Sequence, residues 1–293
     1  MKRLLVLSGK GGTGKTTVAS ALIRLADAKR FADCDVDAPN LHLTVEMPEG
    51  ERREDSYGLP RAEIDQDACV RCGTCARLCR FHAISRGQDG RFVIEPAACE
   101  GCGLCEYACE TRAVSMKPAR TGTLVERGDA ARFYSGATLQ MGSGNSGKLV
   151  SAVKKRLADA GDAGTIAVLD GSPGIGCPVI ASVSGVDLVL IVAEPTLSGL
   201  SDMERILSTA AQLNARCAVC VNKADVNEEI AAAIEAFCAR ETIPFLGRIP
   251  YDPGVAEAVN AGIDIIRHGG AAARAVEEIC VRVSKLLTEE ADG

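Results

Sequence analysis

The sequence predicts an α/β protein with a doubly wound, mostly parallel sheet, into which a small α+β domain is inserted. The first observation is that short apolar segments alternate with helical segments along the chain, which is typical of a parallel sheet covered on both faces. The second is that two cysteine runs interrupt this alternation between residues 60 and 118. A chain of 293 residues is long enough for one large core and a small extra module.

The elements of the main fold can be predicted in chain order. Strands are expected at short apolar segments, residues 4–7, 166–169, 188–193, 218–221 and 244–246, with an abbreviated strand at 29–33. Helices are expected where apolar residues recur at helical spacing, at residues 17–28, 148–160, 200–213, 228–240, 255–260 and 271–290. The last helix carries its apolar residues on one face, which indicates packing against the sheet.

The boundaries of the insertion are indicated by composition. The charged, turn-rich residues 48–58 leave the main fold, and residues 117–122 return to it. We therefore expect residues 1–60 and 118–293 to form the main domain in two parts and residues 61–117 to form the insertion. Short strands are expected within the insertion at 83–84, 92–94 and 113–114.

Two cysteine runs of identical spacing lie in the insertion, and each follows the pattern C-x₂-C-x₂-C-x₃-C. This is the bacterial ferredoxin pattern, in which the fourth cysteine of each run binds the other cluster. The sequence therefore predicts two [4Fe–4S] clusters with crossed ligand sets. The first set is Cys69, Cys72, Cys75 and Cys109, and the second is Cys99, Cys102, Cys105 and Cys79.

Zinc and redox disulfides are the alternatives for these cysteines. Structural zinc sites usually join two separated cysteine pairs, not a run of four. Disulfides are rare in the cytoplasm, where we expect this protein. The proline that commonly follows the fourth cysteine is replaced by Arg80 and Glu110, so the local turn is harder to predict than the ligands.

Composition argues against two classes of partner. The net charge is −6 and aromatic residues make up 3% of the chain, which argues against nucleic-acid binding through phosphates or stacked bases. The N-terminal apolar run is too short for a signal peptide, and no stretch approaches the ~20 apolar residues that span a bilayer. We therefore expect a cytoplasmic protein that binds neither nucleic acid nor membrane.

A glycine-rich loop follows the first predicted strand. Residues 9–16 fit G-x₄-G-K-[ST] between a strand and a helix, the context in which this pattern binds nucleotide phosphates. Lys15 is expected to reach the β- and γ-phosphates, and the Thr16 hydroxyl to bind Mg²⁺. The expected phosphate-binding residues are Gly9, Lys10, Gly11, Gly12, Thr13, Gly14, Lys15, Thr16 and Thr17.

Residues 142–148 fit most of the same pattern. Leu149 replaces the hydroxyl that would bind Mg²⁺, and no convincing strand precedes this segment. We therefore expect a flexible loop before the helix at 148–160, not a second nucleotide site.

Acidic residues are expected to complete the nucleotide site. Asp170 ends an apolar strand, where a carboxylate typically holds Mg²⁺ directly or through water. Asp33, Asp35 and Asp37 follow the first helix, where a switch loop would face the γ-phosphate. The alternative is that these carboxylates lie in exposed turns.

The loop sequence Lys-Gly-Gly-Thr-Gly-Lys-Thr-Thr, which contains Lys10, resembles the deviant Walker A motif of MinD/ParA-type ATPases and the nitrogenase iron protein. Residues 33–35 resemble the first switch of that family, and residues 170–174 resemble its second. Residues 222–225 resemble its base-contacting segment, and residues 249–253 resemble the loop that closes over the base. The whole chain resembles the MinD-superfamily ATPases that carry an inserted ferredoxin domain.

This resemblance implies roles for individual residues. Lys10 would reach the phosphates of the partner subunit in a homodimer, and Asp35 would position the attacking water, so that Lys10, Lys15 and Asp35 are the expected catalytic residues. Mg²⁺ would be held by Thr16, Asp35 and Asp170. The base would lie near Asn222, Asp225, Pro250 and Tyr251.

The identity of the base depends on Asp225. Asn222-Lys-Ala-Asp225 equals the N-K-x-D string by which GTPases recognise guanine, whereas the family resemblance implies ATP. If Asp225 faces the base, an adenine would leave its carboxylate without donors, at a cost of ~1–3 kcal/mol or more. If Asp225 turns away, this penalty vanishes. We expect ATP, with GTP as the alternative.

The remaining cysteines are expected to have structural roles. Cys217 and Cys220 lie on a predicted strand and point to opposite faces, so we expect buried packing there instead of a redox pair. Cys34 and Cys177 lie in the switch segments, where we also expect small buried side chains. The alternative is a thiolate near the dimer interface that shares an additional cluster.

The function expected from these features is an ATP-hydrolysing iron–sulfur protein whose nucleotide state gates electron transfer to a partner protein. The main alternative is a carrier or assembly ATPase for iron–sulfur clusters or metallocofactors. A positioning ATPase of the division-site or plasmid-partition type is less expected, because no basic surface or amphipathic membrane tail is visible.

Overall fold

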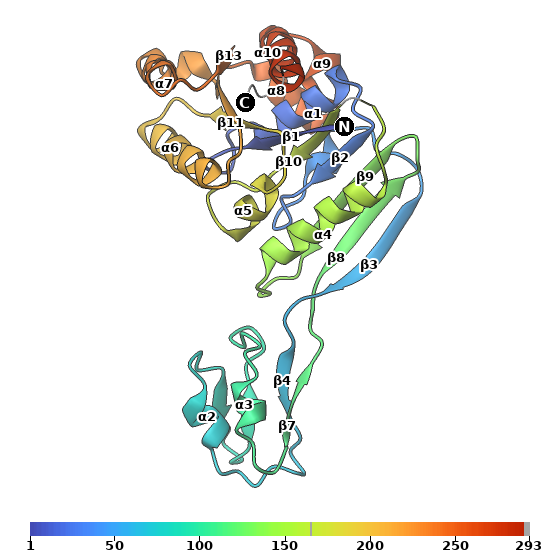
Figure 1. Cartoon of the computed structure of the whole chain (residues 1–293), viewed down its shortest axis with the longest axis vertical. Coiled ribbons are helices and arrows are strands. Elements are labelled where there is room, and N and C mark those ends of the chain that lie inside the picture. Colours follow the sequence, from blue (N-terminus) through green and yellow to red (C-terminus); the bar gives the residue numbers. More distant parts are fainter. Residues whose placement is uncertain (165, 290–293) are drawn as a thin grey trace. The chain divides into compact units, whose positions relative to one another are not determined.

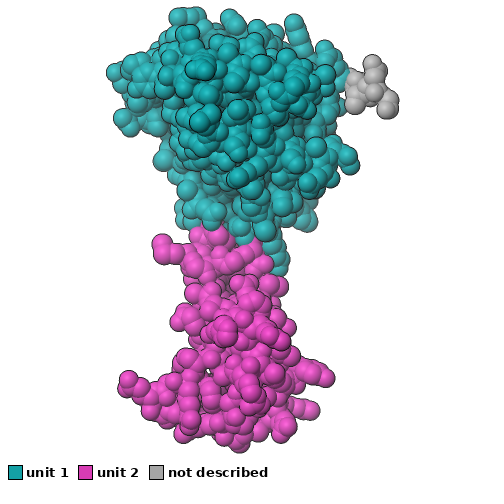
Figure 2. Space-filling view, turned by 90° about the vertical axis from the view of Figure 1, so that its left-hand side faces the viewer, with its two compact units in different colours: residues 1–53, 124–138, 146–293 teal, residues 54–123, 139–145 magenta. Residues whose placement is uncertain are grey.

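The computed structural model describes residues 1–164 and 166–289 of the chain. These residues divide into two compact units, which Figure 2 shows in different colours. Unit 1 comprises residues 1–53, 124–138 and 146 onward, and unit 2 comprises residues 54–123 and 139–145. In the described part of the chain, no helix combines the length and apolar character that crossing a membrane requires.

The main sheet has nine strands within the described residues (Figure 1). Its order is β13 (Phe245–Ile249), β12 (Cys217–Asn222), β11 (Leu188–Ala193), β1 (Lys2–Leu7), β10 (Ile166–Asp170), β2 (Arg30–Asp33), β9 (Phe133–Leu139), β8 (Arg120–Gly128) and β3 (Glu51–Tyr57). The strands from β13 to β9 are parallel to their neighbours. The predicted fold class, a mostly parallel α/β sheet, is therefore confirmed.

Helices cover both faces of this sheet in unit 1 (Figure 1). One layer contains α1 (Lys15–Leu25), α8 (Pro253–Asn260), α9 (Ile265–His268) and α10 (Ala271–Thr288). The other contains α4 (Ser146–Asp159), α5 (Cys177–Val183), α6 (Leu197–Gln212) and α7 (Glu228–Arg240). The expected helices are all present, the one at 228–240 with the expected ends and the others with shifted ends, and residue 290, where we expected the last one to end, lies outside the described residues.

The core explains why the alternating pattern in the sequence was informative. Apolar residues of the central strands, such as Leu4 and Val6, belong to the same buried cluster as residues of α1 and as Val276 and Ile279 of α10. These residues are almost fully buried. Because the carboxyl ends of the parallel strands meet at one edge of the sheet, the loops that follow them converge there, and this edge positions the candidate site.

The expectation that no strand precedes residue 142 was wrong. Strand β9 runs there, parallel to β2, with Phe31 opposite Tyr134. Its residues from Tyr134 to Ala137 are all buried, and they include the small residues Ser135 and Gly136. A strand buried on both faces shows no alternation, and small residues weaken its apolar signal, so the sequence pattern did not reveal it.

The charged residues 48–58 also form regular structure, since most of them belong to β3. The N–H of Gly58 donates to the carbonyl of Ala119, and the N–H of Gly128 donates to that of Gly50, which makes β3 and β8 antiparallel. Six of the seven side chains of β3 are exposed, and cross-strand ion pairs such as Arg120–Asp55, 2.8 Å apart, replace an apolar face. A strand without a buried face lacks the period-two pattern on which its prediction depends.

Unit 2 contains two small antiparallel sheets. Strand β4 (Arg61–Ile64) pairs with β7 (Val114–Lys117), and β5 (Ile84–Arg86) pairs with β6 (Phe92–Ile94). Two short helices, α2 (Thr74–Leu78) and α3 (Leu104–Tyr107), begin after Gly73 and Gly103. Both glycines have left-handed backbone conformations, which favour glycine, so the helix of each cysteine run begins in the same way.

Candidate functional site

The glycine-rich loop lies between β1 and α1, at the carboxyl edge of the sheet. Gly14 has φ of +89°, and a Cβ there would lie 2.3 Å from Nδ2 of Asn222, so the position requires glycine. Nδ2 of Asn222 in turn donates a hydrogen bond to the Thr13 carbonyl at 2.7 Å. The end of β12 therefore fixes the loop, and the N-terminus of α1 offers its N–H groups to a phosphate.

Lys15 and Thr16, in the first turn of α1, both contact Asp170 at the end of β10. Lys15 Nζ lies 2.6 Å from Oδ1 of Asp170 and 3.6 Å from Oδ2 of Asp35. The Thr16 hydroxyl donates to Oδ2 of Asp170 at 2.6 Å. Burial alone would lower the pKa of Lys15, but the neighbouring carboxylates of Asp170 and Asp35 raise it overall. Lys15 therefore remains charged and can neutralise a phosphate.

Asp33, at the end of β2, shapes the loop that carries Asp35. Its carboxylate accepts hydrogen bonds from the backbone N–H groups of Asp35, Asn40 and Leu41, each at 3.0 Å. Burial, with a further contribution from the charge of Asp170, raises the pKa of Asp33 to about 7. Burial also raises the pKa of Asp35. Asp33 thus organises the loop, and Asp35 is the carboxylate that the loop presents to the site.

The loop after β10 is tied to both neighbouring loops. The Ser172 hydroxyl donates to the Cys34 carbonyl at 2.9 Å, which links it to the loop after β2. The N–H of Gly174 donates to the Ser8 carbonyl at 3.0 Å, which links it to the glycine-rich loop. A ligand that shifts one of these three loops must therefore strain or break hydrogen bonds to the others.

Oxygen atoms that could bind Mg²⁺ gather around Thr16. Its hydroxyl lies 2.6 Å from Oδ2 of Asp170 and 3.0 Å from Oδ1 of Asn40, and Asp35 lines the same cavity. Magnesium prefers such oxygen ligands, so this donor set fits the ion. Thr16, Asp35 and Asp170 stay the predicted ligands. Asn40 was not predicted from the sequence, because its place depends on how Asp33 folds the loop.

A cavity of about 470 Å³ lies over the glycine-rich loop. Its size is within the range of small-molecule sites. It is lined by most of the predicted phosphate-binding residues and by both switch segments, namely Ser8, Lys10, Gly11, Gly12, Thr13, Gly14, Lys15, Thr16, Thr17, Asp35, Asp37, Ala38, Asn40, Ser172 and Pro173. The lining does not include Gly9 or the predicted base-contacting residues Asn222, Asp225, Pro250 and Tyr251.

Glu194 follows β11 and contacts two lysines, and it too was not predicted from the sequence. Oε2 of Glu194 lies 2.8 Å from Lys10 Nζ, and Oε1 lies 3.3 Å from Lys223 Nζ. Lys223 also donates to the Gly12 carbonyl at 3.2 Å. The Glu194 carboxylate accepts a hydrogen bond from Lys10 and another from Lys223, and these hold its pKa below its usual range. In this structure, Lys10 is therefore held within its own chain.

Asp225 contacts the loop that follows β13. Its Oδ1 accepts a hydrogen bond from the backbone N–H of Tyr251 at 2.6 Å. The Tyr251 side chain is 57% exposed. One acceptor site of Asp225 is therefore used by the chain itself, a contact that bears on the choice of base.

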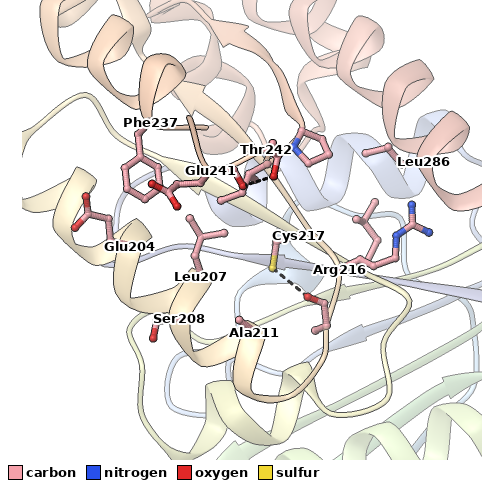
Figure 3. A pocket seen from close by; sticks show the side chains of 14 residues that line it. Glu204, Leu207, Ser208, Ala211, Arg216, Cys217, Phe237, Glu241, Thr242 and Leu286 are labelled. Carbon is pink, nitrogen blue, oxygen red and sulfur yellow. Dashed lines mark hydrogen bonds between the residues drawn. The ribbon is translucent and has the colours of Figure 1, made fainter. Parts of the chain in front are cut away.

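A second cavity of unit 1, of about 540 Å³, lies at the opposite end of the strands, among α6, α7 and α10 (Figure 3). Cys217, at the start of β12, lies in its wall and contacts the Ala215 carbonyl at 3.7 Å. Burial raises the pKa of this thiol to about 11, so it is not a reactive thiolate. Ligands of doubly wound sheets bind at the carboxyl ends of the strands. We therefore assign the nucleotide to the loop cavity.

Unit 2 contains two small cavities among the cysteines. The first, here called the first cysteine cavity, is lined by Cys69, Cys72, Cys75 and Cys109. The second cysteine cavity is lined by Cys99, Cys102, Cys105 and Cys79. Each cavity thus takes three cysteines from one run and the last cysteine of the other.

The spacing of these cysteines bears on which metal group they could hold. Within the described residues, no three His, Cys, Asp or Glu side chains are close enough to bind a single metal ion. Each cavity offers four thiols, three from one run and one from the other, which is the ligand pattern of two-cluster ferredoxins. Their role as ligands stays a prediction.

The two cysteines of the switch segments differ. Cys34 is fully buried, and burial raises its pKa to about 12. Cys177 is exposed at the start of α5, so the expectation of a buried side chain was wrong there. The reason is that residues 171–176 lead the chain to the surface before α5 begins, whereas Cys34 follows β2 directly.

The sequence of this chain is similar to known proteins over most of its length. Residues 4–265 match the family model described as the CobQ/CobB/MinD/ParA nucleotide binding domain. An uncharacterized protein of Methanocaldococcus jannaschii is 37% identical, over 77% of this chain and 79% of its own length. A protein of Pyrococcus furiosus named iron–sulfur cluster carrier protein is 24% identical, over 99% of this chain and 88% of its own.

Solved structures share the fold. The cell division ATPase MinD of Pyrococcus furiosus has a TM-score of 0.56 and 19% identity, with 97% of this chain and 99% of that chain covered. The septum site-determining protein MinD of Pyrococcus horikoshii, complexed with Mg-ADP, has a TM-score of 0.57 and 18% identity, with 100% and 99% covered. At these identities the likeness concerns the fold alone, which is a MinD-like P-loop fold.

Proposed function

The chain belongs to the CobQ/CobB/MinD/ParA nucleotide-binding family as a P-loop ATPase of the MinD/ParA type, and we propose that its nucleotide state gates electron transfer from two [4Fe–4S] clusters to a partner protein. ATP and ADP would favour different arrangements of the loops that carry Asp35 and Asp170. Ordering of such loops by a γ-phosphate and Mg²⁺ is an established way to move an attached element. A ferredoxin-like unit 2 and a relation to the nitrogenase iron protein are part of this proposal.

The observation that carries the proposal is the crossed lining of the two cysteine cavities. Crossed ligation is a property of two-cluster ferredoxins, in which the fourth cysteine of each run binds the other cluster. The clusters would supply one-electron chemistry, and the cysteines would hold them. The chain enters unit 2 through β3, soon after the first switch loop, so the loop and the cluster-bearing unit are close in sequence.

The hydrolysis site would use residues that the sheet already brings together. Lys15 would neutralise the β- and γ-phosphates, and its contact with Asp170 would open as they enter. Asp35 would orient the attacking water. Mg²⁺ would be held by Thr16, Asp35 and Asp170, and it would neutralise charge on the phosphates. Lys10 would act on the phosphates of a second subunit, so we propose a homodimer through the nucleotide site.

Glu194 would then oppose dimerisation, because it holds Lys10 within its own subunit. We expect Glu194→Gln to strengthen dimerisation in the presence of a non-hydrolysable ATP analogue by up to about thirtyfold, since each of the two subunits loses a partly exposed ion pair that contributes about 0.2–1 kcal/mol. Sedimentation equilibrium measures this constant. Glu204→Gln, an exposed change of the same chemistry on α6, should leave it unaltered. A weaker dimer in Glu194→Gln would show instead that Glu194 positions Lys10 for the partner.

ATP is the base assignment that the Asp225 contact favours. Recognition of guanine would require both oxygens of Asp225, to accept from the amino and ring N–H groups of the base. One of these oxygens already accepts the Tyr251 N–H. Asp225 would therefore anchor the base loop, with Pro250 and Tyr251 closing over the base and Asn222 contacting it.

We expect Asp225→Ala to weaken the binding of ATP and GTP by similar factors, because both would lose the same loop anchor. Loss of one such hydrogen bond corresponds to about 0.5–1.5 kcal/mol, or roughly 2–12-fold in affinity. Competition binding of the two nucleotides to both proteins measures this. A wild-type preference for GTP that disappears in Asp225→Ala would contradict the assignment of ATP.

A cluster carrier is the second candidate function, and one specific observation favours it. The Pyrococcus furiosus relative named iron–sulfur cluster carrier protein aligns with almost the whole of this chain. Four thiolates per cluster argue against it, because a cluster with a full protein ligand set is held more firmly than one awaiting transfer.

The two functions can be separated by following the iron. A protein loaded with ⁵⁵Fe is incubated anaerobically with an apo-ferredoxin and ATP. Electron gating predicts that the label stays with this protein through many rounds of hydrolysis. ATP-dependent appearance of the label in the acceptor would establish the carrier function instead.

A further inference from the structure

Charge is distributed unevenly between the two cysteine runs of unit 2. Five arginines and two aspartates lie between residues 66 and 94, which include the first run. Four glutamates and one arginine lie between residues 95 and 112, which include the second. One cysteine in each cavity is exposed. It is Cys72 in the first cysteine cavity and Cys102 in the second. Along the sequence, Cys72 therefore lies among mainly basic residues and Cys102 among mainly acidic ones.

Four exposed arginines, Arg71, Arg77, Arg86 and Arg91, are here called the arginine patch. Arg71 directly precedes Cys72. Nη2 of Arg77 lies 3.3 Å from the Thr74 hydroxyl oxygen, which itself lies 3.5 Å from Sγ of Cys72. Two arginines of the patch therefore flank the exposed cysteine of the first cavity.

The other two arginines extend the patch across the β5–β6 turn. The guanidinium groups of Arg71 and Arg86 are neighbours beside Gly90. A Cβ atom placed on Gly90 would lie 3.9 Å from Nη1 of Arg71 and 3.6 Å from Nη2 of Arg86. Arg91 Nε lies 3.7 Å from Oδ2 of Asp89, and both side chains are more than half exposed. Among the described residues, no other carboxylate is within ion-pair distance of the patch. The patch therefore keeps an excess of positive charge.

Exposed apolar side chains lie beside the patch in the sequence. Val70, next to Arg71, is 67% exposed, and Val93 of β6 is 51% exposed. Apolar residues with a charged rim are typical of transient protein interfaces. Around Cys102 the neighbours are instead Glu100, Leu104 and the carbonyl of Pro60, which packs against Gly101.

We infer that the arginine patch is the docking surface for a small acidic electron-donor protein, which reduces the cluster of the first cysteine cavity; this inference rests on the iron–sulfur function proposed above. One electron passes from the reduced donor to [4Fe–4S]²⁺ and gives [4Fe–4S]⁺, without transfer of a proton. Opposite charges on the two surfaces raise the association rate and orient the donor toward Cys72. Nucleic acid fits less well, since the whole chain has a net charge of −6 and few aromatic residues.

The test uses the cluster-loaded full chain and a plant-type [2Fe–2S] ferredoxin as the acidic probe. Stopped-flow measurement gives the second-order rate of reduction at low and high ionic strength, and titration with oxidised ferredoxin gives the affinity. For the Arg77→Glu/Arg86→Glu protein we expect a rate and an affinity at least about tenfold lower at low salt, with convergence at high salt. The control, Arg61→Glu/Lys117→Glu, makes the same change of charge on β4 and β7 of unit 2.

Each outcome decides the inference. Equal losses in the patch and control proteins would show that only net charge matters and would overturn it. So would tighter binding of a single-stranded oligonucleotide than of ferredoxin, lost in the patch protein. If the chain carries no clusters, the proposed function fails, but the affinity for oxidised ferredoxin still tests the patch.

Discussion

Replacing Lys15 with glutamine should abolish ATP hydrolysis and destabilise the nucleotide-free protein. Lys15 is almost fully buried, 2.6 Å from Asp170 and 3.6 Å from Asp35. Without it, buried carboxylates would lose their cation, a change that typically costs about 3–5 kcal/mol. The same change removes the charge that would bind the phosphates, so we expect the hydrolysis rate to fall by at least about 10²-fold. Urea unfolding and phosphate release measure the two effects.

Lys10 provides the matched control. Its side chain is 40% exposed, and its contact with Glu194 is a partly exposed ion pair that contributes about 0–1 kcal/mol. Lys10→Gln should therefore lose hydrolysis, if Lys10 acts on the partner subunit, but keep nearly all of its stability. Equal free energies of unfolding for Lys15→Gln and the wild type would contradict the view that Lys15 neutralises the buried carboxylates.

Replacing Cys109 with alanine should remove one cluster, and it should be the cluster of the first run. The iron content should fall from about eight to about four atoms per chain, because a cubane that loses one of its four thiolates is expected to be unstable. Iron and sulfide analysis of anaerobically purified protein measures this. Cys280→Ala, a change in α10 of unit 1, should keep the full content.

Paired substitutions test the crossing itself. Under crossed ligation, Cys69→Ala and Cys109→Ala affect the same cluster, so the double variant should still contain about four iron atoms. Cys69→Ala and Cys79→Ala affect different clusters, and their combination should contain none. If each run instead held its own cluster, the two double variants would exchange their iron contents.

The parts of the site that could be predicted are residues that directly follow a strand and that can be recognised from that strand alone. The glycine-rich loop carries its own signal, since glycine, lysine and threonine at fixed spacing need only a preceding strand and a following helix. Asp170 could be expected nearby, because acids at the carboxyl ends of parallel strands meet at one edge. The structure places it 2.6 Å from Lys15, as neighbouring strands β1 and β10 require.

The parts that could not be predicted depend on strand order or on small backbone contacts. Glu194 contacts Lys10 because β11 lies beside β1 in the sheet, and the sequence of neither segment indicates that the two strands are neighbours. Asn40 reaches Thr16 only because three N–H groups bind Asp33 and fold the loop back. The position of Asp225 follows from one backbone hydrogen bond to a loop 26 residues away.

The most direct test of the account is the effect of the nucleotide on electron transfer. The clusters are reduced anaerobically, and their oxidation by a soluble protein acceptor is followed by stopped flow with a non-hydrolysable ATP analogue and Mg²⁺, with ADP and Mg²⁺, or without nucleotide. Oxidation by a small-molecule oxidant serves as the control for cluster accessibility. We predict rates with the protein acceptor that differ at least several-fold between the ATP-like and ADP states, and that become equal in Lys15→Gln. Equal rates in all three states of the wild type would contradict nucleotide gating.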